Sequence, residues 1–187
     1  MIRKLGIFLL LVCFAGAALA ETHAERRAEI NKRRADTLAK LYKVHPAARG
    51  RIAGAYGYAV FTNLGINLVL IAAAGGNGVA HDNKTGHDTY MKMVSGGVGL
   101  GLGVKDFRGI FVFTTQKAFH TFVDEGWEAG VQADAVAKAG KEGGGIEGAI
   151  SVAPGTYLYQ LTENGLALEA TIQGTKYFKD DDLNAGK

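Results

Sequence analysis

The feature that most limits how this chain can fold is the alternating glycine of residues 95–106, SGGVGLGLGVKD. Glycine occupies every second position from Gly97 to Gly103, and valine or leucine lies between. A period of two is that of a β-strand with glycine on one face and aliphatic side chains on the other. Each glycine opposes a helix by about 1 kcal/mol relative to alanine, which argues against a membrane glycine zipper. A bare glycine face instead permits a helix or second sheet to pack closely.

The same stretch does not match a phosphate-binding loop. Such a loop needs its glycines in a turn between a strand and a helix, so that backbone N–H groups converge on the anion. Here no Gly-Lys-Ser/Thr sequence and no helix start follow the glycines. We therefore expect no nucleotide site and no cofactor.

Residues 1–20 have the pattern of a secretory signal peptide. Arg3 and Lys4 precede a short apolar run, and Ala18-Leu19-Ala20 gives a cleavage pattern before Glu21. A lipoprotein signal at Cys13 is the alternative, but Val12 is a poor fit before that cysteine. We expect an exported protein, periplasmic or peripheral to an envelope membrane. Cleavage would remove the single cysteine, and with it any disulfide or thiolate chemistry.

Charge is local in the remaining chain. Loss of the two leader cations takes the basic count from 21 to 19, against 18 acidic residues. Such a chain is not a polycation, and we expect no nucleic-acid partner. The basic residues are concentrated in residues 21–45, which contain no glycine, whereas 46–187 form a glycine-rich domain.

The spacing predicts an amphipathic helical arm over residues 21–45, ended by Pro46. Its predicted apolar stripe consists of Ala24, Ala28, Asn31, Ala35, Leu38 and Tyr42. Its predicted lipid-binding residues, on another face, are Arg26, Arg27, Arg33, Arg34 and Lys40. Anionic headgroups would suit such a face. An ordinary solvated face is the alternative, because acidic residues four positions earlier could pair with two of these cations.

The residue pattern of the glycine-rich domain predicts several strands and one helix. Residues 66–81 and 88–104 flank the turn cluster DNKTG, which indicates a long hairpin. Residues 109–114 and 127–138 read as strands, and 156–172 as a hairpin around Asn164-Gly165. Between them, 115–125 has helical spacing, with Thr115 as its cap and Gly126 at its end. The expected class is α+β: a mainly antiparallel, strongly twisted or barrel-like sheet with an N-terminal helix and one internal helix packed on it.

An ordered set of segments resembles the SYLF domain family over about residues 40–184. The segments are GYAVFTNLG (57–65), AGGNGVA (74–80), SGGVGLGLGVKD (95–106), AGVQADAVAKAG (129–140) and YQLTENGLALEATIQG (159–174). The resemblance implies an antiparallel α+β domain. It also implies binding to acidic or phosphorylated lipids through a basic, amphipathic N-terminal segment. Fungal members are linked to actin, which does not transfer to an exported chain.

Signs of catalysis or metal binding are weak. After residue 20 the only serines are Ser95 and Ser151, and neither lies in a Gly-x-Ser-x-Gly elbow. The best metal candidates are His81, Asp82, His87 and Asp88. Their imidazoles and carboxylates would suit zinc, yet they bracket a turn whose other residues are typical of turns. We therefore expect a polar turn, no metal and no enzyme.

The sequence thus predicts a non-catalytic protein of the cell envelope that binds lipid or a membrane surface, favouring anionic or phosphorylated headgroups. The alternative is a structural or protein-interaction module of the periplasm or outer envelope, with an envelope protein as partner.

Overall fold

The structure, a computed structural model, describes residues 21–63, 73–96, 108–130, 146–162, 165–167 and 174–185. The helical elements are α1 (His23–Val44), α2 (Ala48–Gly54), α3 (Gln116–His120), the π-helical turn η1 (Thr121–Glu125) and α5 (Asp181–Asn184). The first strands are β1 (Gly57–Asn63), β2 (Ala73–Asp82), β3 (Asp88–Gly96), β4 (Arg108–Phe113) and β5 (Trp127–Glu128). The remaining strands are β6 (Ile150–Ala153), β7 (Thr156–Thr162), β8 (Gly165–Ala167) and β9 (Thr175–Lys179).

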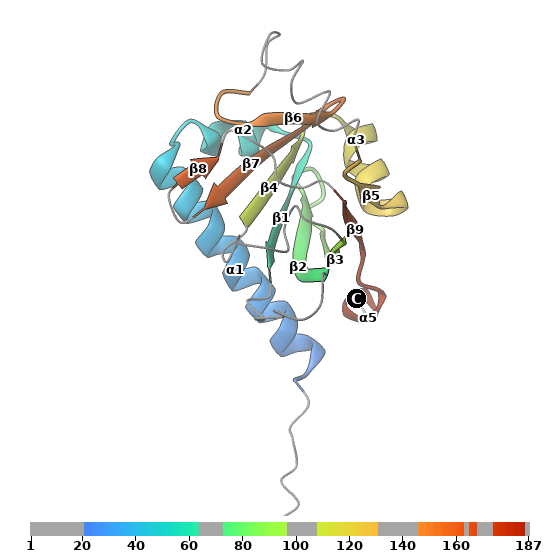
Figure 1. The fold of residues 1–187 in the computed structure, drawn as a ribbon. Helices are drawn as coiled ribbons and strands as arrows, with labels where there is room; N and C mark the ends of the chain where they lie inside the picture. The colour runs from blue at the N-terminus through green and yellow to red at the C-terminus, as the bar shows by residue number, and fades with distance from the viewer. Residues whose placement is uncertain are drawn as a thin grey trace, which may run out of the picture.

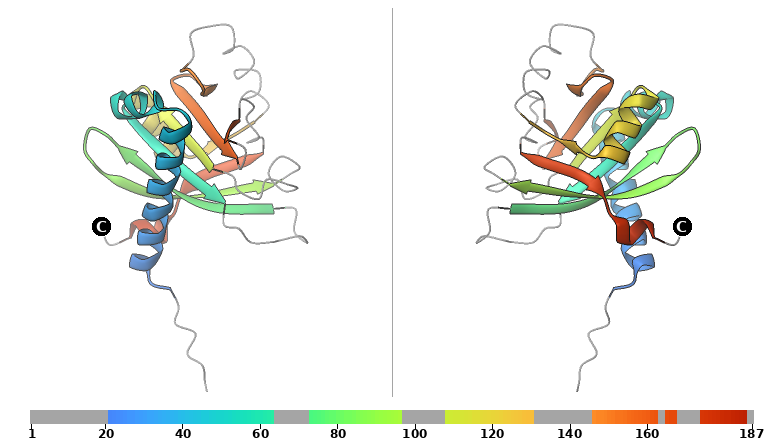
Figure 2. Two further views of the ribbon diagram at one scale, coloured as in Figure 1. Left: turned by 90° about the vertical axis from the view of Figure 1, so that its left-hand side faces the viewer. Right: turned by 90° about the vertical axis from the view of Figure 1, so that its right-hand side faces the viewer.

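The strands form one antiparallel sheet in the order β5-β9-β3-β2-β1-β4-β7-β6, with β8 also paired to β7 (Figure 1). The sheet is strongly curled into a half-barrel, as the two side views show (Figure 2). The long helix α1 lies across its outer face, and α3 with η1 lies on the other side. The predicted α+β class is confirmed.

Both predicted hairpins are present where the structure describes them. β2 and β3 pair from Ala73↔Gly96 to His81↔Asp88 across the DNKTG turn. β7 and β8 pair from Gln160↔Ala167 to Thr162↔Gly165, around the predicted Asn-Gly turn. The strand predicted at 109–114 is β4. Turn residues at these positions therefore identify strand neighbours correctly.

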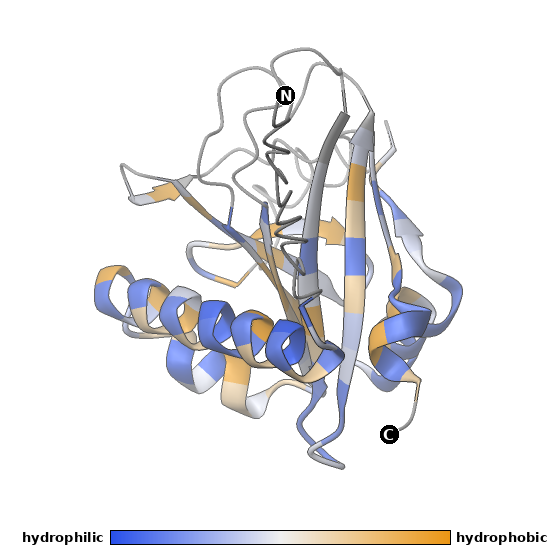
Figure 3. Ribbon diagram, turned by 90° about the horizontal axis from the view of Figure 1, so that it is seen from below, coloured by the Kyte–Doolittle hydropathy of each residue, from blue (hydrophilic) through white to orange (hydrophobic). Residues whose placement is uncertain are grey.

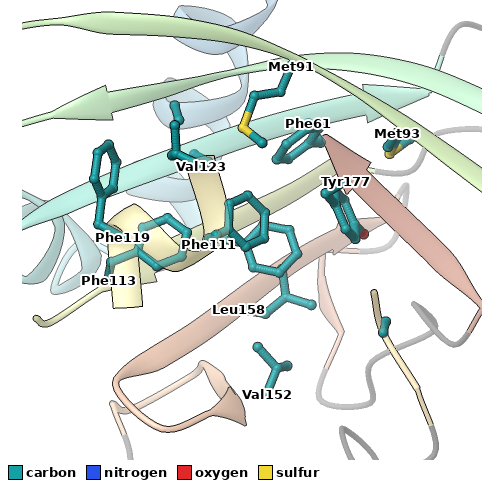
Figure 4. Packing of buried hydrophobic residues seen from close by; sticks show 14 of the residues in the cluster. Phe61, Met91, Met93, Phe111, Phe113, Phe119, Val123, Val152, Leu158 and Tyr177 are labelled. Carbon is teal, nitrogen blue, oxygen red and sulfur yellow. The ribbon is translucent and has the colours of Figure 1, made fainter. Parts of the chain in front are cut away.

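An aromatic core fills the concave face of the sheet (Figure 4). Phe61 and Phe111 project from neighbouring strands, and Phe122 of η1 packs on Phe111 with ring centroids 5.0 Å apart. Tyr177 of β9 closes on Phe61 at 4.8 Å. Residues of both edge strands, β5 and β6, reach this same cluster, so the sheet curls around it. Burial raises the pKa of Tyr177 far above the usual tyrosine range.

A second core lies between the outer face and the first two helices. Val60 and Ile110, which alternate with the inward aromatics, face outward and pack with Leu41 of α1 and Ile52 of α2. Both faces of the central strands are therefore buried, which explains the nearly continuous apolar sequence of β1 and β4.

Glycine on β2 allows the sheet to bend over the aromatic core. A Cβ at Gly78 would lie 2.5 Å from Phe61 Cδ1, and one at Gly76 would lie 2.6 Å from the Thr62 carbonyl oxygen. Gly75, the next residue along β2, has open space around its Cβ position. Gly76 and Gly78 of β2 thus lie where a side chain would meet its neighbours, although the sequence predicts close packing for the glycines of another strand. The alternating glycines of 97–103 lie outside the described residues.

The internal helix is present but is not α-helical throughout. Thr115 Oγ1 accepts a hydrogen bond from the Ala118 N–H at 3.2 Å, as predicted, and α3 begins there. From Thr121 the chain continues as the π-helical turn η1. It ends at Gly126, whose φ of +78° favours glycine. Most of the strand predicted at 127–138 lies outside the described residues, which retain β5 at its start.

Candidate membrane-contacting surface

Helix α1 begins at a capping box. Glu25 N–H donates to Thr22 Oγ1 at 3.2 Å, and the Thr22 N–H donates back to Glu25 Oε2 at 2.8 Å. This hydrogen bond from the Thr22 backbone lowers the pKa of the Glu25 carboxyl. The helix ends at Val44, two residues before Pro46, as the sequence predicts. None of the helices in the described part of the chain is both long and apolar enough to cross a bilayer.

The predicted apolar stripe of α1 is wrong in its alanines. Ala24, Ala28 and Ala35 are exposed, whereas the buried residues are Ile30, Thr37 and Leu41. The face turned to the sheet is therefore the one with Ile30, Thr37 and Leu41, and the arginines Arg26, Arg27, Arg33 and Arg34 are partly buried. Figure 3 shows α1 as a mainly hydrophilic helix. Small alanines contribute little to burial, so periodicity alone did not reveal the docked face.

Two of the predicted lipid-binding residues contact the C-terminal segment. Arg26 Nη2 lies 3.6 Å from the buried Asp180 carboxylate, which Lys92 also approaches at 3.0 Å. Arg27 Nε donates to the Leu183 carbonyl at 2.8 Å, and its Nη2 to the Ala185 carbonyl at 3.0 Å. These carbonyls end α5, where cations are favoured by the helix dipole.

The other three residues also have partners within the protein. Arg34 Nη1 lies 2.7 Å from Asp88 Oδ1 on β3. Arg33 pairs within the helix with Glu29 at 2.9 Å. Lys40 Nζ donates to the Thr162 carbonyl at 3.3 Å. Four of the five basic residues therefore contact other parts of the protein, and Arg33 pairs within α1. Their role in binding lipid headgroups stays a prediction.

The elbow, which we define as residues 42–51 joining α1 to α2, carries cations that differ from those of α1 in their exposure and pairing. Lys43, Arg49 and Arg51 are exposed, and among the described residues no carboxylate pairs with them. The chain has no acidic residue between Asp36 and Asp82. Val44, with 48% of its surface exposed, lies beside them in the chain. The elbow therefore offers both positive charge and apolar surface to water.

The elbow is held rigidly on the body. Leu41, which directly precedes the elbow, and Ala48, which lies within it, are fully buried in the outer core. The Arg49 guanidinium lies 4.4 Å from the centroid of the Tyr42 ring. Burial raises the pKa of Tyr42, and the neighbouring arginine opposes that shift only in part. Because the backbone of the elbow is already ordered, binding does not need to order it, which lowers the entropy cost.

The polar turn between β2 and β3 organises its own backbone. Asp82 accepts hydrogen bonds from the N–H groups of Lys84 at 2.7 Å and Thr85 at 3.1 Å. Burial raises the pKa of Asp82, but these two hydrogen bonds, together with the Thr85 hydroxyl and nearby His120, outweigh burial and lower the pKa. His81 Nδ1 lies 2.7 Å from Asp88 Oδ1, while the exposed His87 side chain makes no contact with this pair that the structure records. Within the described residues no three His, Cys, Asp or Glu side chains are grouped to hold a metal ion.

The sequence matches known proteins. The family model Ysc84, described as "Las17-binding protein actin regulator", matches residues 94–186. "Beta cell expansion factor A" of Aeromonas veronii is 38% identical over 163 residues, which are 87% of this chain and 60% of the relative. The chain belongs to the SYLF (Ysc84) family. This SYLF chain spans about three fifths of the curated relative it matches.

The family match begins within β3, so α1 and the elbow of this SYLF chain precede it. Sequence reasoning found the arginines of α1 but missed Lys43, Arg49 and Arg51. The signal that could have found them is the uninterrupted stretch from 37 to 81 without a carboxylate. Such a stretch cannot neutralise its cations locally.

Proposed function

We propose that this protein is an exported, non-catalytic component of the cell envelope that binds anionic membrane surfaces, and that the elbow makes the first contact. The supporting observation is the exposed group of Lys43, Arg49 and Arg51 with no carboxylate partner among the described residues. Each basic residue near an anionic surface contributes about 1 kcal/mol, within a Debye length. Exposed Val44 adds apolar surface of the kind that interfacial helices use.

The test is co-sedimentation with vesicles of anionic or neutral lipid. The variant Lys43→Gln/Arg49→Gln/Arg51→Gln removes three charges from the elbow. We expect its affinity for anionic vesicles to fall by one to two orders of magnitude, following about 1 kcal/mol per cation. Parent binding should weaken at high salt and be absent on neutral vesicles.

A matched control carries the same charge change elsewhere. Lys84→Gln/Lys117→Gln/Lys176→Gln removes three exposed lysines from other parts of the molecule. The proposal requires a much smaller loss of binding in this control. Equal losses of affinity in both variants would show that the vesicles attract the net charge of the protein and that the elbow has no special role. If the parent bound neither kind of vesicle, the proposed function would be refuted.

The alternative, a protein-interaction module of the envelope, has one observation in its favour. Phe178 and Val94 are exposed by 40% and 45% on the neighbouring strands β9 and β3, with Lys92 and Lys176 paired opposite them. Exposed apolar side chains among charges are common at protein interfaces. Replacing both with serine should leave vesicle binding intact and abolish capture of an envelope partner if this role holds.

A further inference from the structure

The N-terminal half of α1, residues 23–37, is held on the body mainly by charge. Arg26, Arg27 and Arg34 reach the Asp180 carboxylate, the end of α5 and the Asp88 carboxylate respectively. The Asn31 amide adds one hydrogen bond to the Tyr90 hydroxyl at 2.8 Å. The Asp180 side chain is buried, but Arg26 is 33% exposed and its Nη2 lies 3.6 Å from the carboxylate, while Arg34 and Asp88 are 19% and 22% exposed. Ion pairs that keep contact with water contribute modestly and weaken with salt.

Apolar contact beneath this half is small and its polar groups are incompletely satisfied. Ile30 is its only buried aliphatic residue, in a cluster of four with Val79, Tyr90 and Leu183. Asn31 Oδ1, Thr37 Oγ1 and Asn77 Oδ1 are buried without a hydrogen-bond partner. A buried polar atom without a partner destabilises the closed arrangement. The C-terminal half differs, because Leu41 is fully buried in the large outer core.

We propose that the N-terminal half of α1 is an electrostatic latch that an anionic membrane opens. This inference rests on the membrane function proposed above. The elbow brings the protein to the surface, and Arg26, Arg27 and Arg34 then exchange their protein partners for lipid phosphate oxygens. The buried end of α1 at Leu41 serves as the fixed point.

The exchange is driven by a difference in affinity between the two states. In the closed state the three arginines are occupied, whereas in the open state they are available for bidentate contacts with phosphate. A ligand shifts an equilibrium only when it binds one state better, and phosphate binds the open state better here.

Two variants weaken the latch while every cation stays in place. Asp180→Asn removes the carboxylate beside Arg26 but keeps an Oδ1 acceptor for the Leu183 N–H, so the cap of α5 is retained. Asp88→Asn removes the charge beside Arg34 at a half-exposed position, which protects the test if the buried change disturbs folding. Asp36→Asn makes the same charge change on the exposed side of α1 and is the matched control.

The measurement is affinity for anionic vesicles at low salt. We expect Asp180→Asn and Asp88→Asn to bind about two- to five-fold more tightly than Asp36→Asn, which is the gain from releasing one weak ion pair. Equal affinity in the three variants would overturn the latch, because any increase over the parent would then come only from the change in net charge.

Spin labels report the movement directly. In a Cys13→Ser chain, labels at Ala28→Cys on α1 and Lys84→Cys on the β2–β3 turn occupy exposed positions. We expect their separation to lengthen on anionic vesicles and to stay unchanged on neutral ones. Vesicle binding with an unchanged separation would overturn the latch alone. No binding by the parent would overturn the proposed function and the latch with it.

Discussion

At the scale of single residues, Gly78 shows how closely β2 approaches its neighbour. The position its Cβ would take is already occupied by the Phe61 ring and the Val60 carbonyl oxygen. A backbone oxygen cannot move without disturbing the β1–β2 pairing. Glycine here is a packing requirement, since no turn or positive φ is involved.

We expect Gly78→Val to lower the free energy of unfolding by roughly 1–3 kcal/mol through overpacking. Chemical denaturation measures the change. Gly75→Val on the same strand is the control, because its Cβ would meet open space and valine favours a strand. An equal loss of unfolding free energy at both positions would mean that glycine is needed for its backbone conformation and that close packing is unimportant.

Asp82 is one residue through which stability depends on pH. Its folded pKa lies below the ordinary value of 3.8 because the turn N–H groups stabilise the carboxylate. The contribution is therefore present in full above that ordinary value, and it disappears as the pH falls through the lower folded pKa.

We expect Asp82→Ala to cost about 1–2 kcal/mol at pH 7, from two lost hydrogen bonds to a buried carboxylate. The difference from the parent should shrink in acid, below the ordinary pKa of the carboxyl. Urea denaturation at neutral and acid pH gives the comparison. A difference that stays constant down to pH 2 would show that the side chain acts by packing alone.

At the scale of elements, the sequence predicted both hairpins, β4, the internal helix and the extent of α1. These features depend on local signals: turn residues, period-two alternation and caps. The sheet order and β6, β9 and α5 were not predicted, because their partners are distant in the sequence and their own patterns are short. The docked face of α1 was misassigned because its buried residues are Ile30, Thr37 and Leu41, whereas the alanines of the predicted stripe are exposed.

The two halves of α1 should differ in stability. Ile30→Ala removes the one buried aliphatic residue of the first half, so we expect faster amide hydrogen exchange over residues 23–36 and little change in Tm. Leu41→Ala leaves a cavity in the outer core and should cost about 2–5 kcal/mol of global stability. Exchange monitored by mass spectrometry, together with thermal melting, separates the two. Uniform exchange along α1 in Ile30→Ala would show a single cooperative helix.

At the scale of the whole molecule, the proposed export leads to an expected mature form beginning at Glu21. Cleavage there would leave intact the Thr22–Glu25 capping box that starts α1. The intact mass of the exported protein should match residues 21–187. A lipid-modified cysteine at its N-terminus would contradict this and indicate processing before Cys13.

The contacts between Arg27 and the end of α5 join positions 156 and 158 residues apart. The first helix therefore cannot complete its docking until the last residues of the chain have been synthesised, and β9 likewise must wait to join β3. Contacts of such separation slow folding, because much of the chain must be ordered before they form. Slow completion of these contacts would suit the export proposed above, because a narrow export channel passes a chain that has not finished folding.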